Sequence, residues 1–280
     1  VVISTSRRVD SGTPAASQGR PGTVPSRPNP AAMEFFNGLG GFAANGKEYV
    51  TVLGEGQWTP APWINVIANP AFGFQVSVEG GGYTWSGNSR EHQLTGWSND
   101  PVCDRPVEVL YVRDEDSGRL WSPTALPIRE AAGYYVVAHG QGYSRFERVA
   151  HGIALELVQF VAIDDPIKVS RLTIRNRSTR TRRLSVTAYV EWVLGHSRGV
   201  TAPFTVTEVD GDSGVMLARN PWSNEYAERV ACADLCGRQT SWTGDRKEFV
   251  GRHGTLAEPA ALVGGRPLSG RVGMGFDPCS

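Results

Sequence analysis

The chain has 280 residues, of which 40% are hydrophobic and 20% charged, enough apolar content for one large all-β domain or two ordinary domains. Lys plus Arg and Asp plus Glu each number 28, so the net charge is zero, which argues against nucleic acid or an anionic membrane surface as a partner. No apolar run reaches the roughly 18 residues that a transmembrane helix needs, so no direct membrane span is predicted.

Residues 1–32 are rich in Ser, Pro, Gly, Arg and Thr and show little periodicity, which is typical of a linker or flexible arm. The sequence begins with Val, and it lacks the charged segment and apolar core of a signal peptide. We therefore expect a piece of a longer protein. A folded domain is predicted over residues 33–280.

The folded part is predicted to begin with a hairpin, in which Asn45 and Gly46 separate two β-prone runs. Further runs alternate with period two: FGFQVSV, VEVLYVRD, YSRFERV, IALELVQFVAI, IKVSRLTIRN and LSVTAYVEWVL. In the last run a set of apolar residues is predicted to face the core: Leu184, Val186, Ala188, Val190, Trp192 and Leu194. The alternate set is predicted to face a wetter side: Ser185, Thr187, Tyr189, Glu191 and Val193.

Long strands joined by short turns predict a large antiparallel two-sheet β-sandwich, an all-β fold. The best helix candidate, residues 221–235, is short and is equally consistent with an irregular turn.

Several residue types that carry chemistry occur in patterns typical of turns. The runs DEDSG (114–118) and DGDSG (210–214) resemble the start of a calcium loop but lack its later ligands. The glycines at 80–82 link two strand-like runs, which favours a hairpin over a phosphate cradle. Neither the five His nor the four Cys show metal-binding spacing, and a G-x-S-x-G elbow is missing. We predict no metal site and no catalytic residue in this chain. The four Cys are predicted to be free thiols in a reducing compartment.

The segment from Tyr83 to Asp104, YTWSGNSREHQLTGWSNDPVCD, is the most informative part of the sequence. Trp and Tyr rings stack on the C–H faces of sugars, and Asn, Asp and Arg hydrogen-bond to sugar hydroxyls. The alternative is that Trp85 and Trp97 are core anchors and that residues 99–101 form a turn. Asp100 and Asp104 are of the type used in glycoside chemistry, but surface carboxylates are common, and no catalytic pair is predicted.

The stretch NPAFGFQVSVEGGGYTWSGNSREHQLTGWSNDPVCD, with YVRDEDSGRLWSPTALP after it, resembles the sandwich domain of glycoside hydrolase family 94, formerly glycosyltransferase family 36. The resemblance covers residues 33–279, and residues 35–62 most resemble the carboxy-terminal part of cyclic β-1,2-glucan synthases. Seven residues match the motif and become candidates for facing the substrate: Tyr83, Trp85, Asn88, Arg90, Trp97, Asn99 and Asp100. Gly96 stands where the family has Pro, which loosens the loop, and Cys103 stands where it has Ser.

The resemblance implies that catalysis belongs to an (α/α)6 barrel that follows the sandwich, and no (α/α)6 barrel is expected in this chain. There an Asp protonates the glycosidic oxygen while phosphate attacks with inversion, so inorganic phosphate is a co-substrate and no cofactor is needed. The sandwich packs on the barrel, shapes the substrate entrance and takes part in homodimer contacts. A β-glucan or oligosaccharide is the expected ligand. The chain ends at GMGFDPCS, before the family's closing strands, which implies a truncated sandwich.

Three functions remain open on these grounds. The first is a non-catalytic sandwich domain of a cyclic β-1,2-glucan synthase-like glycosyltransferase or inverting glycoside phosphorylase, rimming the sugar site of its barrel. The second is a stand-alone carbohydrate-binding module, and the third is a purely structural or dimerisation domain. The resemblance implies a cytoplasmic location, with the longer enzyme anchored at the cytoplasmic face of a bacterial inner membrane.

Overall fold

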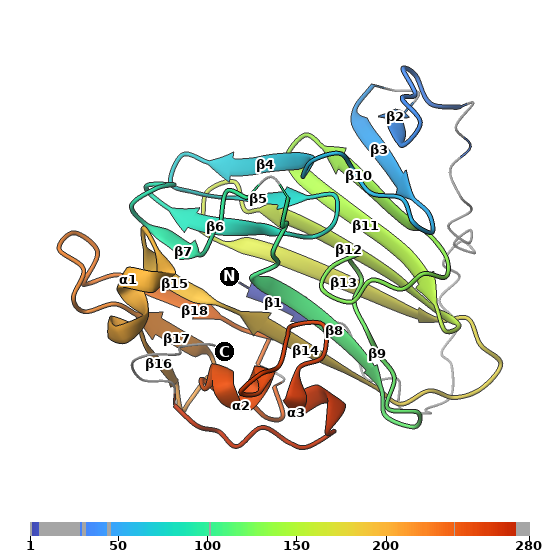
Figure 1. Ribbon diagram of the computed structural model, residues 1–280. Helices are drawn as coiled ribbons and strands as arrows, with labels where there is room; N and C mark the ends of the chain where they lie inside the picture. Colours follow the sequence, from blue (N-terminus) through green and yellow to red (C-terminus); the bar gives the residue numbers. More distant parts are fainter. Residues whose placement is uncertain are drawn as a thin grey trace.

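The structure, a computed structural model, describes residues 2–5, 29, 32–43, 46–100, 102–237 and 239–272. Their regular structure is chiefly β-strands, which are arranged in two packed layers (Figure 1). One layer is a seven-stranded sheet in the order β1-β13-β12-β11-β10-β3-β2. Its strands are β1 (Val2–Thr5), β2 (Gly40–Phe42), β3 (Glu48–Leu53), β10 (Tyr135–Gly140), β11 (Tyr143–Ala150), β12 (Ile153–Val161) and β13 (Lys168–Asn176). Neighbouring strands pair antiparallel, except that β1 runs parallel to β13.

The opposite layer consists of a five-stranded and a three-stranded sheet, ordered β15-β7-β6-β5-β4 and β14-β8-β9. The first contains β4 (Ile64–Asn69), β5 (Phe72–Ser77), β6 (Gly82–Ser86), β7 (Gln93–Thr95) and β15 (Trp192–Gly195). The second contains β8 (Glu108–Asp114), β9 (Leu120–Trp121) and β14 (Leu184–Val190). Only Glu191 separates β14 from β15, so one stretch of chain passes from one sheet into the other.

A small sheet and a few short helices complete the described fold. The sheet is formed by β16 (Val206–Val209), β17 (Met216–Arg219) and β18 (Val230–Ala233). The helices are α1 (Arg198–Thr201), the 3-10 turn η2 (Ala202–Phe204), α2 (Arg246–Val250) and α3 (Ala260–Val263). Figure 1 shows α2 and α3 below β8 and β14. Among the residues described, no helix has the length and apolar character needed to cross a membrane.

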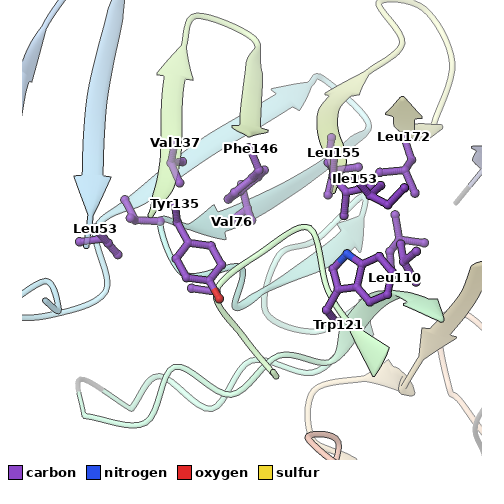
Figure 2. Packing of buried hydrophobic residues seen from close by; sticks show 14 of the residues in the cluster. Leu53, Val76, Leu110, Trp121, Tyr135, Val137, Phe146, Ile153, Leu155 and Leu172 are labelled. Atoms are coloured by element: carbon purple, nitrogen blue, oxygen red, sulfur yellow. The ribbon is translucent and has the colours of Figure 1, made fainter. Parts of the chain in front are cut away.

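The main core lies between the two layers, where alternate apolar residues of both meet. Figure 2 shows Trp121 of β9 beside Leu110 of β8, facing Ile153 and Leu155 of β12 in the other layer. Trp121 and Ile153 are fully buried. Burying one large apolar side chain stabilises the fold by about 1.5–3 kcal/mol, so this interface is the principal source of stability. The predicted large antiparallel two-sheet β-sandwich is confirmed.

The prediction of one wetter face along residues 184–194 is wrong for half of the run. Tyr189, Glu191 and Val193 are 0%, 2% and 0% exposed, although they alternate with the core-facing set. The reason is a second covering layer, because the ring of Phe249 in α2 stacks on Tyr189 with centroids 5.2 Å apart. The predicted core-facing set divides between two hydrophobic clusters. Leu184, Val186 and Ala188 pack against the main core between the layers, whereas Val190, Trp192 and Leu194 belong to a cluster that also contains residues of β18.

Both Asp-rich runs form turns, as predicted: one joins β8 to β9 and the other joins β16 to β17. The hairpin predicted at 45–46 is present as the antiparallel pair β2 and β3, with Gly46 at φ 66°, although Asn45 lies outside the described residues. Of the predicted helix or turn at 221–235, residues 221–229 form irregular turns, but the prediction is wrong for residues 230–233, which form β18 because they pair with β17. The boundary between residues 32 and 33 stays a prediction, and most of the predicted arm falls outside the described ranges.

Candidate functional site

Three aromatic residues of the 83–104 segment come together at the β6–β7 hairpin. Tyr83 is 6% exposed, and its ring is stacked on that of Trp97, with centroids 5.3 Å apart and an interplanar angle of 3°. Trp85 approaches the same Tyr83 ring at 5.2 Å with a tilt of 38°. Trp97 is 42% exposed. Tyr83 therefore anchors the group, and Trp97 presents a large part of its ring to solvent.

Trp85 is the half-buried member of this group and packs over β5. A Cβ atom placed on Gly73 would lie 2.5 Å from Cζ2 of Trp85 and 2.7 Å from Cβ of Ala68. Such distances are shorter than real contacts, so the indole occupies the space that a side chain at residue 73 would take. Trp85 acts mainly in packing, which was the alternative left open for it by its sequence.

Asn88 and Arg90 lie at the exposed tip of the hairpin. The Asn88 Oδ1 accepts hydrogen bonds from the backbone N–H groups of Arg90 and Glu91, each at 2.9 Å, which makes Asn88 a turn residue. Arg90 has a side chain 88% exposed and lies 3.3 Å from the Glu91 carboxylate. An ion pair this exposed contributes little to stability, so Arg90 is available at the surface.

Asn99 and Asp100 lie on the loop that follows β7. Asn99 has φ 50°, a left-handed conformation that Asn tolerates better than most residues. The Asp100 Oδ1 accepts hydrogen bonds from the N–H groups of Val102 and Cys103 at 2.8 and 3.0 Å. These bonds to Cys103 and Val102 lower the pKa of Asp100, so its exposed carboxylate is ionised and holds the turn.

Asp104 is an anchor of the same loop, a role that its sequence did not reveal. Its carboxylate accepts a short hydrogen bond from Ser77, whose Oγ in turn accepts from the N–H groups of Gly80 and Gly81 at 3.1 and 3.0 Å. Burial raises the pKa of Asp104, whereas Asp100 is solvated, so the two carboxylates have different surroundings and structural tasks.

His92 is a further residue of this segment that sequence reasoning passed over. It is 4% exposed, its Nδ1 lies 2.8 Å from the Ser86 carbonyl oxygen, and its ring stacks on Tyr226 with centroids 4.0 Å apart. Burial lowers the pKa of His92, so the neutral ring donates from Nδ1 to that carbonyl. The only signal in the sequence was a single His between polar residues, which carries no pattern.

Together, the segment combines buried and turn-forming residues with an exposed aromatic and polar surface. Tyr83, Asn88 and Asp104 hold the backbone, and the exposed groups are the rings and polar side chains of Trp97, Arg90, Asn99 and Asp100. An aromatic face next to hydrogen-bonding groups suits a ligand with both C–H faces and hydroxyls.

The chain matches the family described as Glycosyl hydrolase 94, supersandwich domain, over residues 47–280. It is 44% identical over 248 residues to the cyclic beta-(1,2)-glucan synthase NdvB of Rhizobium meliloti (strain 1021), covering 89% of this chain and 9% of that protein. It is 28% identical to the solabiose phosphorylase of Paenibacillus borealis, covering 81% of this chain and 30% of that protein. It is 26% identical to the N,N'-diacetylchitobiose phosphorylase of Vibrio proteolyticus, covering 81% of this chain and 29% of that protein.

The chain thus spans less than a third of the length of each of these relatives. The family match extends over most of the sequence, and the described residues form the β-sandwich that its description names. This chain belongs to glycosyl hydrolase family 94 and contains its supersandwich domain.

Proposed function

We propose that this chain is the non-catalytic sandwich domain of a cyclic β-1,2-glucan synthase-like glycosyltransferase or glycoside phosphorylase, and that its 83–104 segment rims the sugar site. The observation that carries the proposal is the half-exposed Trp97 ring held against the buried Tyr83 ring. A ring fixed in this way loses little conformational entropy when a sugar stacks on it. The relatives are named for a glucan and for disaccharides, which supports a sugar as the ligand.

Under this proposal the catalytic acid and the phosphate-binding groups lie in an (α/α)6 barrel elsewhere in the same protein. The Trp97 surface faces that barrel across the bound sugar, with Asn99 and Asp100 beside it. Inorganic phosphate is the co-substrate, and the enzyme works as a homodimer on the cytoplasmic side of the inner membrane. The long portions of the relatives that this chain does not cover leave room for such a domain.

The proposal is tested in the full-length protein that carries this chain by replacing Trp97 with Ala. One lost aromatic contact is worth about 0.5–1.5 kcal/mol, so the KM for a β-1,2-glucan should rise roughly two- to tenfold. The matched control is Trp58→Ala, because Trp58 is also exposed, at 54%, but lies against Arg129 and not in the Tyr83–Trp97 stack. Equal KM values for the two variants would contradict the proposal.

Two measurements on the chain alone separate the other functions. Phosphate-dependent release of a sugar phosphate by the purified chain would overturn its non-catalytic role. Calorimetric titration with short β-1,2-glucans then tests for a stand-alone module. If the chain binds the glucan and the Trp97→Ala variant does not, a stand-alone module is favoured. If the chain is folded but Trp97 makes no contribution to binding, the segment acts only together with the barrel.

A further inference from the structure

A cavity of about 130 Å³ lies between the β6–β7 hairpin and the segment that joins β17 to β18. Phe72, Leu94 and Leu194 form apolar parts of its wall. Within the described chain, its lining residues differ from the seven that the sequence singled out. The exposed Arg229 and Val230 also line it, so the cavity reaches the surface at this segment.

The polar groups of the cavity come from both sides. Ser86 and His92 belong to the hairpin, whereas Tyr226 and Arg229 belong to the opposite segment. The Nδ1 of His92 is engaged with the Ser86 carbonyl oxygen at 2.8 Å, which leaves Nε2 as the ring atom able to accept a hydrogen bond. The stacked Tyr226 ring, with centroids 4.0 Å apart, keeps the imidazole in this orientation.

The neutral state of His92 favours a hydroxyl group over an anionic oxygen at its Nε2. Burial is the main cause that lowers the pKa of His92, and it outweighs the hydrogen bond to the Ser86 carbonyl, which raises the pKa. The imidazole is therefore neutral at pH 7, and its Nε2 repels an anionic oxygen but accepts a hydrogen bond from a hydroxyl group. Arg229 supplies donors only, and Ser86 both donates and accepts. Sugar hydroxyls, which donate and accept, match this set.

The size of the cavity suits one six-membered ring. A cavity of roughly 150 Å³ takes up a benzene molecule, so a cavity of about 130 Å³ takes up part of a pyranose ring, with the remaining ring substituents in the open mouth. Asn220 also lines the cavity, and its Oδ1 accepts the N–H of Trp222 at 3.1 Å. Trp222 is 74% exposed, and its ring lies 5.4 Å from that of Phe204 in η2, so an aromatic pair forms where the loop after Asn220 meets η2.

We propose that this cavity binds one hexopyranose residue, the end of an oligosaccharide chain, as a second sugar site distinct from the exposed surface around Trp97. The apolar wall covers the C–H face of the ring, and Ser86, His92 and Arg229 bind its hydroxyls. The inference stands on the cavity itself and does not require that Trp97 contacts a sugar.

The test is titration of the chain with glucose, with a β-1,2-linked glucose disaccharide and with inorganic phosphate, followed by calorimetry and ligand-observed NMR. A ligand of this size should bind with a dissociation constant on the order of millimolar. Ala231→Leu fills the cavity from β18, and Arg229→Ala removes an exposed donor without disturbing the core. Each should weaken disaccharide binding about tenfold.

Two controls separate this site from the one proposed above. Trp97→Ala should leave binding in the cavity unchanged, and so should Arg252→Ala, which removes an exposed arginine elsewhere. The proposal is overturned if the folded chain binds neither sugar at about 50 mM, well above the expected constant. It is also overturned if Ala231→Leu and Arg229→Ala both bind like the unmodified chain, or if phosphate binds and the sugars do not.

Discussion

The rings of Tyr83 and Trp97 lie parallel, 3° apart, with their centroids separated by 5.3 Å. The Tyr83 ring is buried in β6, and the Trp97 ring is half exposed on the loop after β7. The buried ring therefore holds the exposed ring in a fixed position at the surface. This pair connects the fold to the proposed sugar contact, because loss of the buried ring leaves the exposed ring without support.

Tyr83→Ala should therefore destabilise the chain and free Trp97. Removing a buried aromatic side chain lowers the free energy of unfolding by about 3–5 kcal/mol. Tyr83→Phe keeps the stack and loses only the hydrogen bond from the hydroxyl to the Ser89 carbonyl oxygen, at 3.2 Å. The expected loss for that variant is about 1 kcal/mol. Denaturant unfolding gives the two free energies, and acrylamide quenching reports the exposure of Trp97. Equal stabilities of the Ala and Phe variants would show that the stack does not support the fold.

Gly81→Ala should displace Asp104 and loosen the loop that carries Asp100. A Cβ atom at residue 81 would lie 2.0 Å from Oδ1 of Asp104, so the carboxylate has to leave its place beside Ser77. The expected cost is roughly 1–3 kcal/mol in the free energy of unfolding. Gly211→Ala is the control, since nothing lies within 4 Å of its added Cβ. A Gly81→Ala variant as stable as this control would contradict the assigned anchor.

Glu191→Gln should be among the most damaging single changes. The Glu191 carboxylate is 3% exposed and lies 3.3, 3.2 and 3.1 Å from Arg105, Arg198 and Arg246. Burial alone would raise the pKa of Glu191, but Arg105 and the other partners lower it overall, so its charge is retained. Breaking a buried pair costs about 3–5 kcal/mol.

The matched control for this change is Glu91→Gln at an exposed pair, with an expected effect within roughly 0.5 kcal/mol. Thermal and urea unfolding compare the two variants. If both lose the same free energy, Glu191 is not the centre of the network.

The stability of the chain should fall on acidification partly because of His139. Burial lowers the pKa of His139 to about 4, and its Nδ1 lies 2.9 Å from the Ser144 Oγ. Because the folded state holds the neutral ring, the stabilising contribution is complete above the ordinary pKa of 6.5 and is lost as the pH falls through about 4. Between the two ends of this pH range, the contribution of His139 to the free energy of unfolding differs by roughly 3 kcal/mol.

An NMR titration of the His139 ring and urea unfolding between pH 7 and pH 4 measure this effect. His139→Gln should show a flatter dependence on pH than the unmodified chain. A ring that titrates near its ordinary pKa would mean that protonation of His139 is not coupled to unfolding.

Local sequence predicted more of the fold than of the surface. The period-two runs located most strands, and the DEDSG and DGDSG runs located two hairpin turns, because strand alternation and turn chemistry depend on neighbouring residues. The same alternation failed at Tyr189, since α2 covers that face and comes from residues more than fifty positions later in the chain. Trp85 and Trp97 look alike in sequence, and only packing over Gly73 distinguishes the half-buried ring from the exposed one.

The sequence by itself determined that this chain is an all-β sandwich with an aromatic, polar segment at residues 83–104. These features follow from the alternation of apolar and polar residues along the strands and from the residue types of the segment. The tertiary structure alone decided that Tyr83 supports Trp97, that Asp104 anchors the loop, and that His92 faces a cavity with Tyr226. These relationships join residues from different strands and loops. Their distances follow from how the layers pack, and no local pattern records them.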